Sequence, residues 1–187
     1  QWKAFADQPL DVFLRVEPDP VDAAPLYNLL CPAAAFEQQQ AAVQAVGAEP
    51  LGLRSAVVIA PHLGAANENL FGRRDSRGRF GLSTAAGTRV GLLEGAQRAA
   101  LAGDRLSLRE VAKAVVQTAL IPHWDVDFIT AFPDSAWEQR SFAQASVCYE
   151  VAVAADLAGA WLTAAGRELV VRRLAEQGLG NINYVTW

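Results

Sequence analysis

The chain has 187 residues, of which 52% are hydrophobic and 19% charged, so it can bury a sizeable core within one domain and is not expected to be disordered. Sixteen basic and twenty acidic residues give a formal net charge of −4, which argues against general affinity for nucleic acid or an anionic membrane surface. The longest weakly charged run, 147–165, contains Glu150 and Asp156, and both charges are costly in hydrocarbon. We therefore expect neither a transmembrane segment nor a nucleic-acid partner.

The N-terminal residues 1–22 are expected to form an apolar arm that leads into a proline-rich linker. Apolar side chains are dense between Trp2 and Val16, so the arm should pack against the rest of the chain. Its part from Leu10 to Val16 fits either a short helix or an edge strand. The linker spans 17–25 and is stiff, because each proline fixes its own φ and restricts the residue before it.

Residues 23–180 are expected to form a single helical domain. Its first helix lies between Pro32, which suits a first helical turn, and Gly47, which suits a helix end. The inward-facing side chains of this helix are predicted to be Phe36, Val43 and Val46. The following segment, 51–60, is a short apolar run that periodicity cannot assign to helix or strand, and its helical surroundings favour a helix.

A second helix is predicted over 84–101 and is closed by Gly103. Glu94 precedes Arg98 by four residues, which predicts an ion pair on the helix surface. Three glycines also repeat at intervals of four residues, a pattern that indicates close helix packing more than a ligand site. These glycines are Gly87, Gly91 and Gly95.

The next helix is predicted to open with a capping box formed by Ser107 and Glu110 and to end at Pro122. Its spacing separates an apolar face from a polar face. The core-facing residues are predicted to be Leu108, Ala112, Val115 and Ala119, and the water-facing ones Arg109, Lys113 and Gln117.

The central element of the fold is predicted to be one helix from Ser135 to Ala165. Ser135 and Glu138 form a capping box at its start. Apolar residues then recur at alternating spacings of four and three and form one continuous stripe. This stripe is Val147, Val151, Ala154, Ala158, Trp161 and Ala165. The neighbouring faces are apolar too, so we expect other helices to enclose this one, with Glu150 and Asp156 each bound to an arginine or placed at the rim.

After this helix, Gly166 is expected to break or bend the chain before a last helix over 167–177, which Gly178 would end. The complete pattern predicts an all-α fold, an irregular or orthogonal bundle of about six helices around residues 135–165. An arginine-rich, hairpin-like loop over 67–83 interrupts it. Residues 181–187 form an extended C-terminal tail that docks either on its own fold or on a partner.

The two histidines are the first candidates for acid–base or metal chemistry, because histidine titrates near neutrality and often binds metals. His123 precedes two alternating carboxylates, Asp125 and Asp127, which could converge with it in an extended segment. Together with His62 they make a conceivable metal site or acid–base pair. The alternative is that His123 and Asp125 only cap helix ends and satisfy loop backbone. No motif indicates a particular metal or cofactor.

A second candidate site is the basic loop, which could hold a phosphate, a carboxylate or single-stranded nucleic acid. The acidic total favours the alternative, a solvated hairpin or a docking surface for an acidic protein partner. Its basic residues are Arg73, Arg74, Arg77 and Arg79. Trp187, at the end of the tail, is a further candidate contact residue.

Two functional hypotheses follow from these patterns. The first is a non-catalytic binding, adaptor or accessory subunit that contacts a protein partner, or another copy of itself, through the N-terminal arm, the arginine-rich loop and the aromatic tail. It rests on the missing catalytic motifs and on the unusual residues in exposed connections. The alternative is a small hydrolase or metal-assisted enzyme that uses the histidine and aspartate candidates.

Two features of the sequence leave the compartment and the cysteines open. No N-terminal run has the basic and then apolar character of a signal peptide, and the chain contains no Met. A cytoplasmic protein is therefore favoured, with a processed, exported chain as the alternative. Cys31 and Cys148 could form one disulfide or remain two buried thiols.

Overall fold

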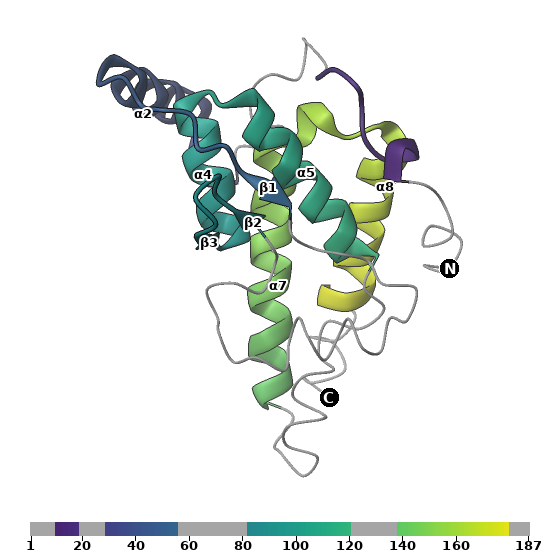
Figure 1. Ribbon diagram of the computed structural model, residues 1–187. Coiled ribbons are helices and arrows are strands. Elements are labelled where there is room, and N and C mark those ends of the chain that lie inside the picture. Colours follow the sequence, from purple (N-terminus) through teal and green to yellow (C-terminus); the bar gives the residue numbers. More distant parts are fainter. Residues whose placement is uncertain (1–9, 19–28, 56–81, 121–137, 180–187) are drawn as a thin grey trace.

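The computed structural model describes residues 10–18, 29–55, 82–120 and 138–179, and in these ranges the fold is mostly helical (Figure 1). Its α-helices in the described ranges are α2 (Ala33–Ala45), α4 (Leu92–Ala102), α5 (Arg105–Ala119), α7 (Glu138–Leu157) and α8 (Ala164–Arg173). The predicted helical class is thus confirmed, although a small sheet accompanies the helices. The predictions of about six helices and of the boundaries at residues 22 and 180 stay predictions.

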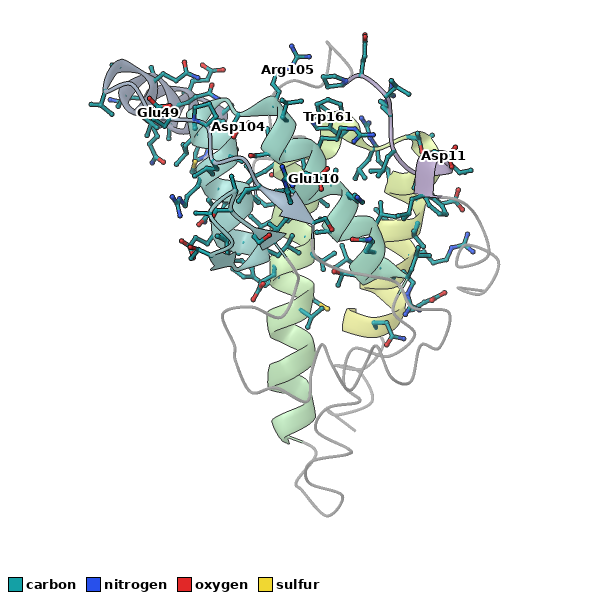
Figure 2. The ribbon with its side chains drawn as sticks, viewed as in Figure 1. Asp11, Glu49, Asp104, Arg105, Glu110 and Trp161 are labelled. Carbon is teal, nitrogen blue, oxygen red and sulfur yellow. The ribbon has the colours of Figure 1, made fainter. Side chains whose placement is uncertain are left out.

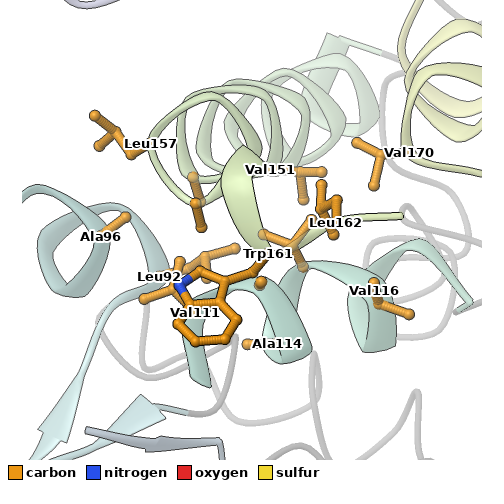
Figure 3. Packing of buried hydrophobic residues seen from close by; sticks show 14 of the residues in the cluster. Leu92, Ala96, Val111, Ala114, Val116, Val151, Leu157, Trp161, Leu162 and Val170 are labelled. Atoms are coloured by element: carbon orange, nitrogen blue, oxygen red, sulfur yellow. The ribbon is translucent and has the colours of Figure 1, made fainter. Parts of the chain in front are cut away.

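The core forms where α4, α5 and α7 pack on one another and α8 packs on α5 and α7 (Figure 1). The apolar stripe predicted for the central helix faces this core. Val147, Val151, Ala154 and Ala158 are all fully buried, and Trp161 is only 5% exposed. Figure 3 shows the Trp161 indole beside Leu92, Val111 and Ala114. The predicted stripe is therefore enclosed as expected, but a neighbouring face of α7 is not, because Tyr149 is 54% exposed. Helix α2 packs on α4 and projects away from the other helices.

The central helix is shorter than predicted, because it ends at Leu157 and a 3-10 turn, η2 (Gly159–Trp161), follows it. Leu162 is extended, and Thr163 then caps α8 by accepting the N–H of Gly166 at 3.1 Å. Such a cap satisfies a backbone donor at a helix start. The break thus lies between residues 158 and 163, and Gly166 lies inside α8 instead of interrupting the chain. Residues 135–137 lie outside the described residues.

The N-terminal arm packs into the core in the described range, as predicted. A short 3-10 turn, η1 (Leu10–Val12), precedes an isolated β-bridge between Leu14 and Leu162, so a short helical turn occurs but no edge strand forms in this segment. The arm is held by hydrogen bonds from Arg15 N–H to the Trp161 carbonyl (2.8 Å) and from Thr163 N–H to the Phe13 carbonyl (3.0 Å). Phe13 itself is fully buried.

The sheet has three antiparallel strands in the order β1 (Arg54–Ser55), β2 (Leu82–Ser83) and β3 (Arg89–Val90). Arg54 pairs with Ser83, and Leu82 pairs with Val90. The helix predicted for 51–60 is therefore wrong in its described part. The described end of the predicted arginine-rich loop belongs to β2.

The helix predicted from residue 84 begins only at Leu92, because a tight turn and β3 come first. Gly87 lies in that turn with φ +80°, a left-handed conformation that favours glycine, and Gly91 is the N-cap of α4. Only Gly95 has the predicted packing role. A Cβ atom there would lie 2.7 Å from the Leu82 side chain. The ion pair between Glu94 and Arg98 is confirmed at 3.3 Å.

Helix α5 begins three residues earlier than predicted. Its N-cap is Asp104, whose carboxylate accepts the Ser107 N–H at 3.0 Å and the Ser107 hydroxyl at 2.6 Å. The prediction that Ser107 is the N-cap is therefore wrong, because Asp104 is the N-cap and Ser107 donates to it. Gly103, in a left-handed conformation with φ +68°, closes α4 as predicted. Ala112, Val115 and Ala119 are buried as expected.

A row of side chains on α5 holds the segment that leads into β1 (Figure 2). The backbone N–H groups of Leu51, Leu53 and Ser55 donate to Asp104, Ser107 and Glu110, respectively, at 2.8–2.9 Å. Gln117 is only 5% exposed, so the prediction that it faces water is wrong. Its side-chain oxygen accepts the Ser55 hydroxyl at 2.5 Å. Alternate N–H groups of an extended segment point to the same side of it. On this side the side chains at residues 104, 107 and 110 accept the hydrogen bonds that a neighbouring strand would otherwise accept.

The predicted bounds of α2 are correct to within one residue, and Gly47 follows it with φ +71°. Phe36 is buried as predicted, but Val46 is 82% exposed, so its inward placement is wrong.

The last helix departs from the prediction at its end. Leu169 and Val170 are buried as expected. The chain continues past α8 as a π-helix, η3 (Leu174–Leu179), which includes the predicted terminator Gly178. Arg173 is 1% exposed and donates from Nε to the Ala119 carbonyl at the end of α5 (2.9 Å).

Candidate functional site

Every catalytic, metal or anion-binding residue predicted from the sequence lies outside the described residues. These residues are His62, His123, Asp125, Asp127, Arg73, Arg74, Arg77, Arg79 and Trp187. Their roles stay predictions. Within residues 10–18, 29–55, 82–120 and 138–179, no group of three or more His, Cys, Asp or Glu side chains could hold a metal ion. Across the same ranges, no helix is long and apolar enough to cross a membrane.

The two cysteines are free thiols, which decides between the two states that the sequence left open. Both side chains are partly buried. Burial disfavours the thiolate and raises the pKa of Cys148 to about 11. Burial therefore disfavours the thiolate form of Cys148 at neutral pH.

The described residues contain a half-open cavity of about 90 Å³ between α7 and α8, which we call the α7–α8 cavity. Its walls are largely apolar. They are formed by Ala152 and Ala155 of α7, Val170 and Val171 of α8, Leu174 at the start of η3, and Leu29 and Leu162. Asp156 and Arg167 also line it, and they are its charged residues. The cavity thus joins an apolar surface to a carboxylate and a guanidinium.

Helical spacing explains how the sequence builds this cavity. On α7, positions 152, 155 and 156 share one face, and on α8, positions 167, 170, 171 and 174 do the same. Alanine carries a single side-chain carbon, so the α7 face is too short to fill the space in front of the valines of α8. The cavity is the space that these small side chains leave.

The charged residues of the cavity are bound within the protein. Asp156 is 2% exposed, and its Oδ2 accepts the N–H of Leu29 at 2.9 Å. Arg167 donates to the Gly159 carbonyl at 3.3 Å. A buried charge is tolerated only when such partners replace water. Of the two places expected for Asp156, beside an arginine or at the rim, the rim is wrong, because Asp156 ties residue 29 to α7 from a buried position.

Large apolar side chains surround the opening of the cavity. Leu29 is 51% exposed and Val171 is 59% exposed, and both also line the cavity. Tyr149, 54% exposed, lies one helical turn before Ala152 and therefore on the same face of α7. An exposed apolar rim around a concave site is the usual form of a recognition surface. The alanine-rich face of α7 is visible in the sequence and could have indicated this surface. Periodicity alone assigned that face to the core, because it shows only that the face is apolar.

A second cavity, of about 300 Å³, lies between α2 and α4. It is lined by Leu30, Cys31, Phe36, Gln39, Gln97 and Leu101. Its lining mixes apolar side chains with two amides and a thiol and contains no charged group. Its lining has no carboxylate, imidazole, amine or guanidinium, so it is a weaker candidate for acid–base chemistry or ion recognition.

Comparison of the chain with protein-family models, curated proteins and solved structures finds no match.

Proposed function

We propose that this chain is a non-catalytic helical binding protein that docks an apolar segment of a protein partner in the α7–α8 cavity. The observation that carries the proposal is a concave apolar site whose rim residues, Leu29 and Val171, are more than half exposed. Each such side chain gains free energy when a partner removes it from water, at roughly 25 cal/mol per Å² of apolar area. The site is thus suited to recognition more than to catalysis.

The other contact surfaces expected from the sequence remain part of the proposal. In the N-terminal arm, Phe13 and Leu14 serve the chain's own core, whereas Val16 is 88% exposed and is the residue that a partner would meet. The arginine-rich loop would add a contact to an anionic group of the partner, and the aromatic tail would add a contact through Trp187. The bundle that carries these surfaces would have about six helices. A second copy of the chain is one form that the partner could take.

A peptide library displayed on phage and selected against the purified protein tests the proposal. We expect the enriched peptides to share an apolar anchor residue. We expect Val171→Glu to weaken their binding at least tenfold, because the new carboxylate would have to be desolvated at the rim.

Val46→Glu is the matched control, since Val46 is an exposed valine on a different part of the structure. It should leave binding unchanged. Failure to enrich any apolar peptide, or equal loss in both variants, would refute the proposal. Sedimentation of both variants tests self-association, and a dimer that Val171→Glu alone dissociates would identify the partner as a second copy.

A further inference from the structure

We infer that the α7–α8 cavity accepts one aliphatic side chain of about four carbon atoms from a short peptide segment, and that Ala152 and Ala155 set this size limit. This inference rests on the proposed function and specifies the chemistry of the partner and the residues that select it.

The volume of the cavity limits the apolar group that it accepts. An apolar cavity of about 150 Å³ takes up a benzene molecule, which has six carbon atoms. The α7–α8 cavity has about 90 Å³ and therefore holds about four carbon atoms. The side chain of leucine or isoleucine has four carbon atoms and that of valine has three, whereas the side chain of phenylalanine has seven. Aliphatic side chains thus fit the cavity, and aromatic ones exceed it.

The two alanines of α7 decide how deep the cavity is. Ala152 and Ala155 are both half-buried, and both line the cavity. Each contributes a single side-chain carbon, so a longer side chain at either position would occupy the space that a ligand needs. Seven of the nine lining residues are apolar, so an inserted aliphatic group meets carbon atoms on several sides. The two alanines are therefore the residues that determine specificity at this site.

The wall formed by Leu29 is in place before a ligand arrives. The Leu29 backbone N–H donates to Oδ2 of Asp156 at 2.9 Å, and Asp156 is itself buried in α7. This hydrogen bond holds the backbone of residue 29 against the helix, so the wall does not have to be ordered on binding. A preformed wall lowers the entropic cost of binding and keeps the size limit sharp.

The area of the rim argues for a short segment instead of a folded face of a second copy. The rim side chains Leu29, Tyr149 and Val171 are 51–59% exposed. Even at the 150–250 Å² that an aromatic side chain can bury, three half-exposed side chains offer no more than roughly 400 Å². A stable interface between folded proteins buries about 800 Å² on each partner. One inserted side chain with its flanking backbone needs no larger face than the rim provides.

Four probes that share a neutral backbone and differ only in the side chain test the inference by NMR titration of the wild-type chain. They are the N-acetyl amides of alanine, valine, leucine and phenylalanine. We expect the leucine and valine probes to bind most tightly. The alanine probe should bind about tenfold more weakly than the leucine probe, because it leaves most of the cavity empty.

The phenylalanine probe separates a cavity of limited size from a general apolar surface. It should bind about threefold more weakly than the leucine probe, because its ring exceeds the cavity and would force the walls apart. A general apolar surface would give the opposite order, because affinity would rise with the apolar area of the probe.

Two substitutions should change the size limit in opposite directions. Ala155→Leu should fill the cavity and weaken binding of the leucine probe at least tenfold, while α7 stays intact because leucine is a good helix former. Leu174→Ala should widen the cavity, so the phenylalanine probe should gain at least threefold relative to the leucine probe. Ala35→Leu is the matched control, because Ala35 is a half-buried helical alanine of α2 outside the lining, and it should leave all four affinities unchanged.

The wild-type series decides the question even if a variant fails to fold. A phenylalanine or alanine probe that binds as tightly as the leucine probe would overturn the inference while leaving the proposed function intact. A dimer that Val171→Glu alone dissociates would do the same, as would absence of probe binding combined with enrichment of apolar peptides from the library. Absence of both probe binding and peptide enrichment would remove the proposed function as well.

Discussion

Replacement of Gly166 by alanine tests how tightly the N-terminal arm is locked onto α8. Gly166 lies in the first turn of α8, directly against the arm. A Cβ atom there would lie less than 3.0 Å from the Phe13 carbonyl oxygen and 3.2 Å from the Phe13 carbonyl carbon. Both are backbone atoms, so no side-chain rotation can relieve the overlap. The arm must move instead.

The expected change in the free energy of unfolding combines one stabilising effect and two destabilising effects. Alanine favours an α-helix over glycine by about 1 kcal/mol. Overpacking costs about 1–3 kcal/mol, and a displaced arm weakens the hydrogen bonds Arg15–Trp161 and Thr163–Phe13, each of which contributes about 1 kcal/mol. We therefore expect Gly166→Ala to lower the free energy of unfolding by about 3 kcal/mol, a large fraction of the total for a domain.

Equilibrium urea unfolding measures this change, and hydrogen exchange locates it. Exchange should accelerate at the amides of Arg15 and Thr163. Gly95→Ala is the control, because its closest atom is the tip of the Leu82 side chain, which can rotate, so the loss should be about 1 kcal/mol or less. A Gly166→Ala protein as stable as the wild type, or no less stable than Gly95→Ala, would show that the arm is not packed as described.

Three further predictions concern charge, thiol reactivity and metal binding. Burial raises the pKa of Asp104, but the hydrogen bonds that its carboxylate accepts, chiefly from Ser107, lower the pKa by more. The net pKa is therefore below the ordinary 3.8. The stability from this carboxylate is therefore present above about pH 4 and is lost as pH falls through the lowered pKa. Asp104→Asn replaces one of the two accepting oxygens with an NH2 group, so it should cost about 1 kcal/mol at pH 7 and progressively less in acid, as measured by urea unfolding. A pH-independent difference would contradict this. Iodoacetamide at pH 8 should alkylate Cys31 faster than Cys148, whose thiol stays protonated, and peptide mass mapping that shows equal rates would refute it. The metal-assisted enzyme hypothesis predicts one divalent metal per chain that is lost in His123→Ala, and elemental analysis of a metal-free wild-type protein would exclude it.

The features that the sequence alone determined are those with local causes. The apolar stripe from Val147 to Ala158 predicts burial because residues three and four apart share a helix face. Gly47 and Gly103 mark helix ends because they adopt left-handed backbone conformations that other residues resist. Glu94 and Arg98 pair because one helical turn brings them together.

The features that only the tertiary structure decided depend on partners distant in sequence. The central helix stops at Leu157, and Leu162 instead forms a β-bridge with Leu14, 148 positions earlier. Gln117 is buried because Ser55 supplies its hydrogen bond across a separation of 62 residues. The α7–α8 cavity exists because two short alanine side chains face valines of another helix. Periodicity shows which face of a helix is apolar, but whether a neighbour fills that face, binds it or leaves it open depends on how the chain folds back on itself.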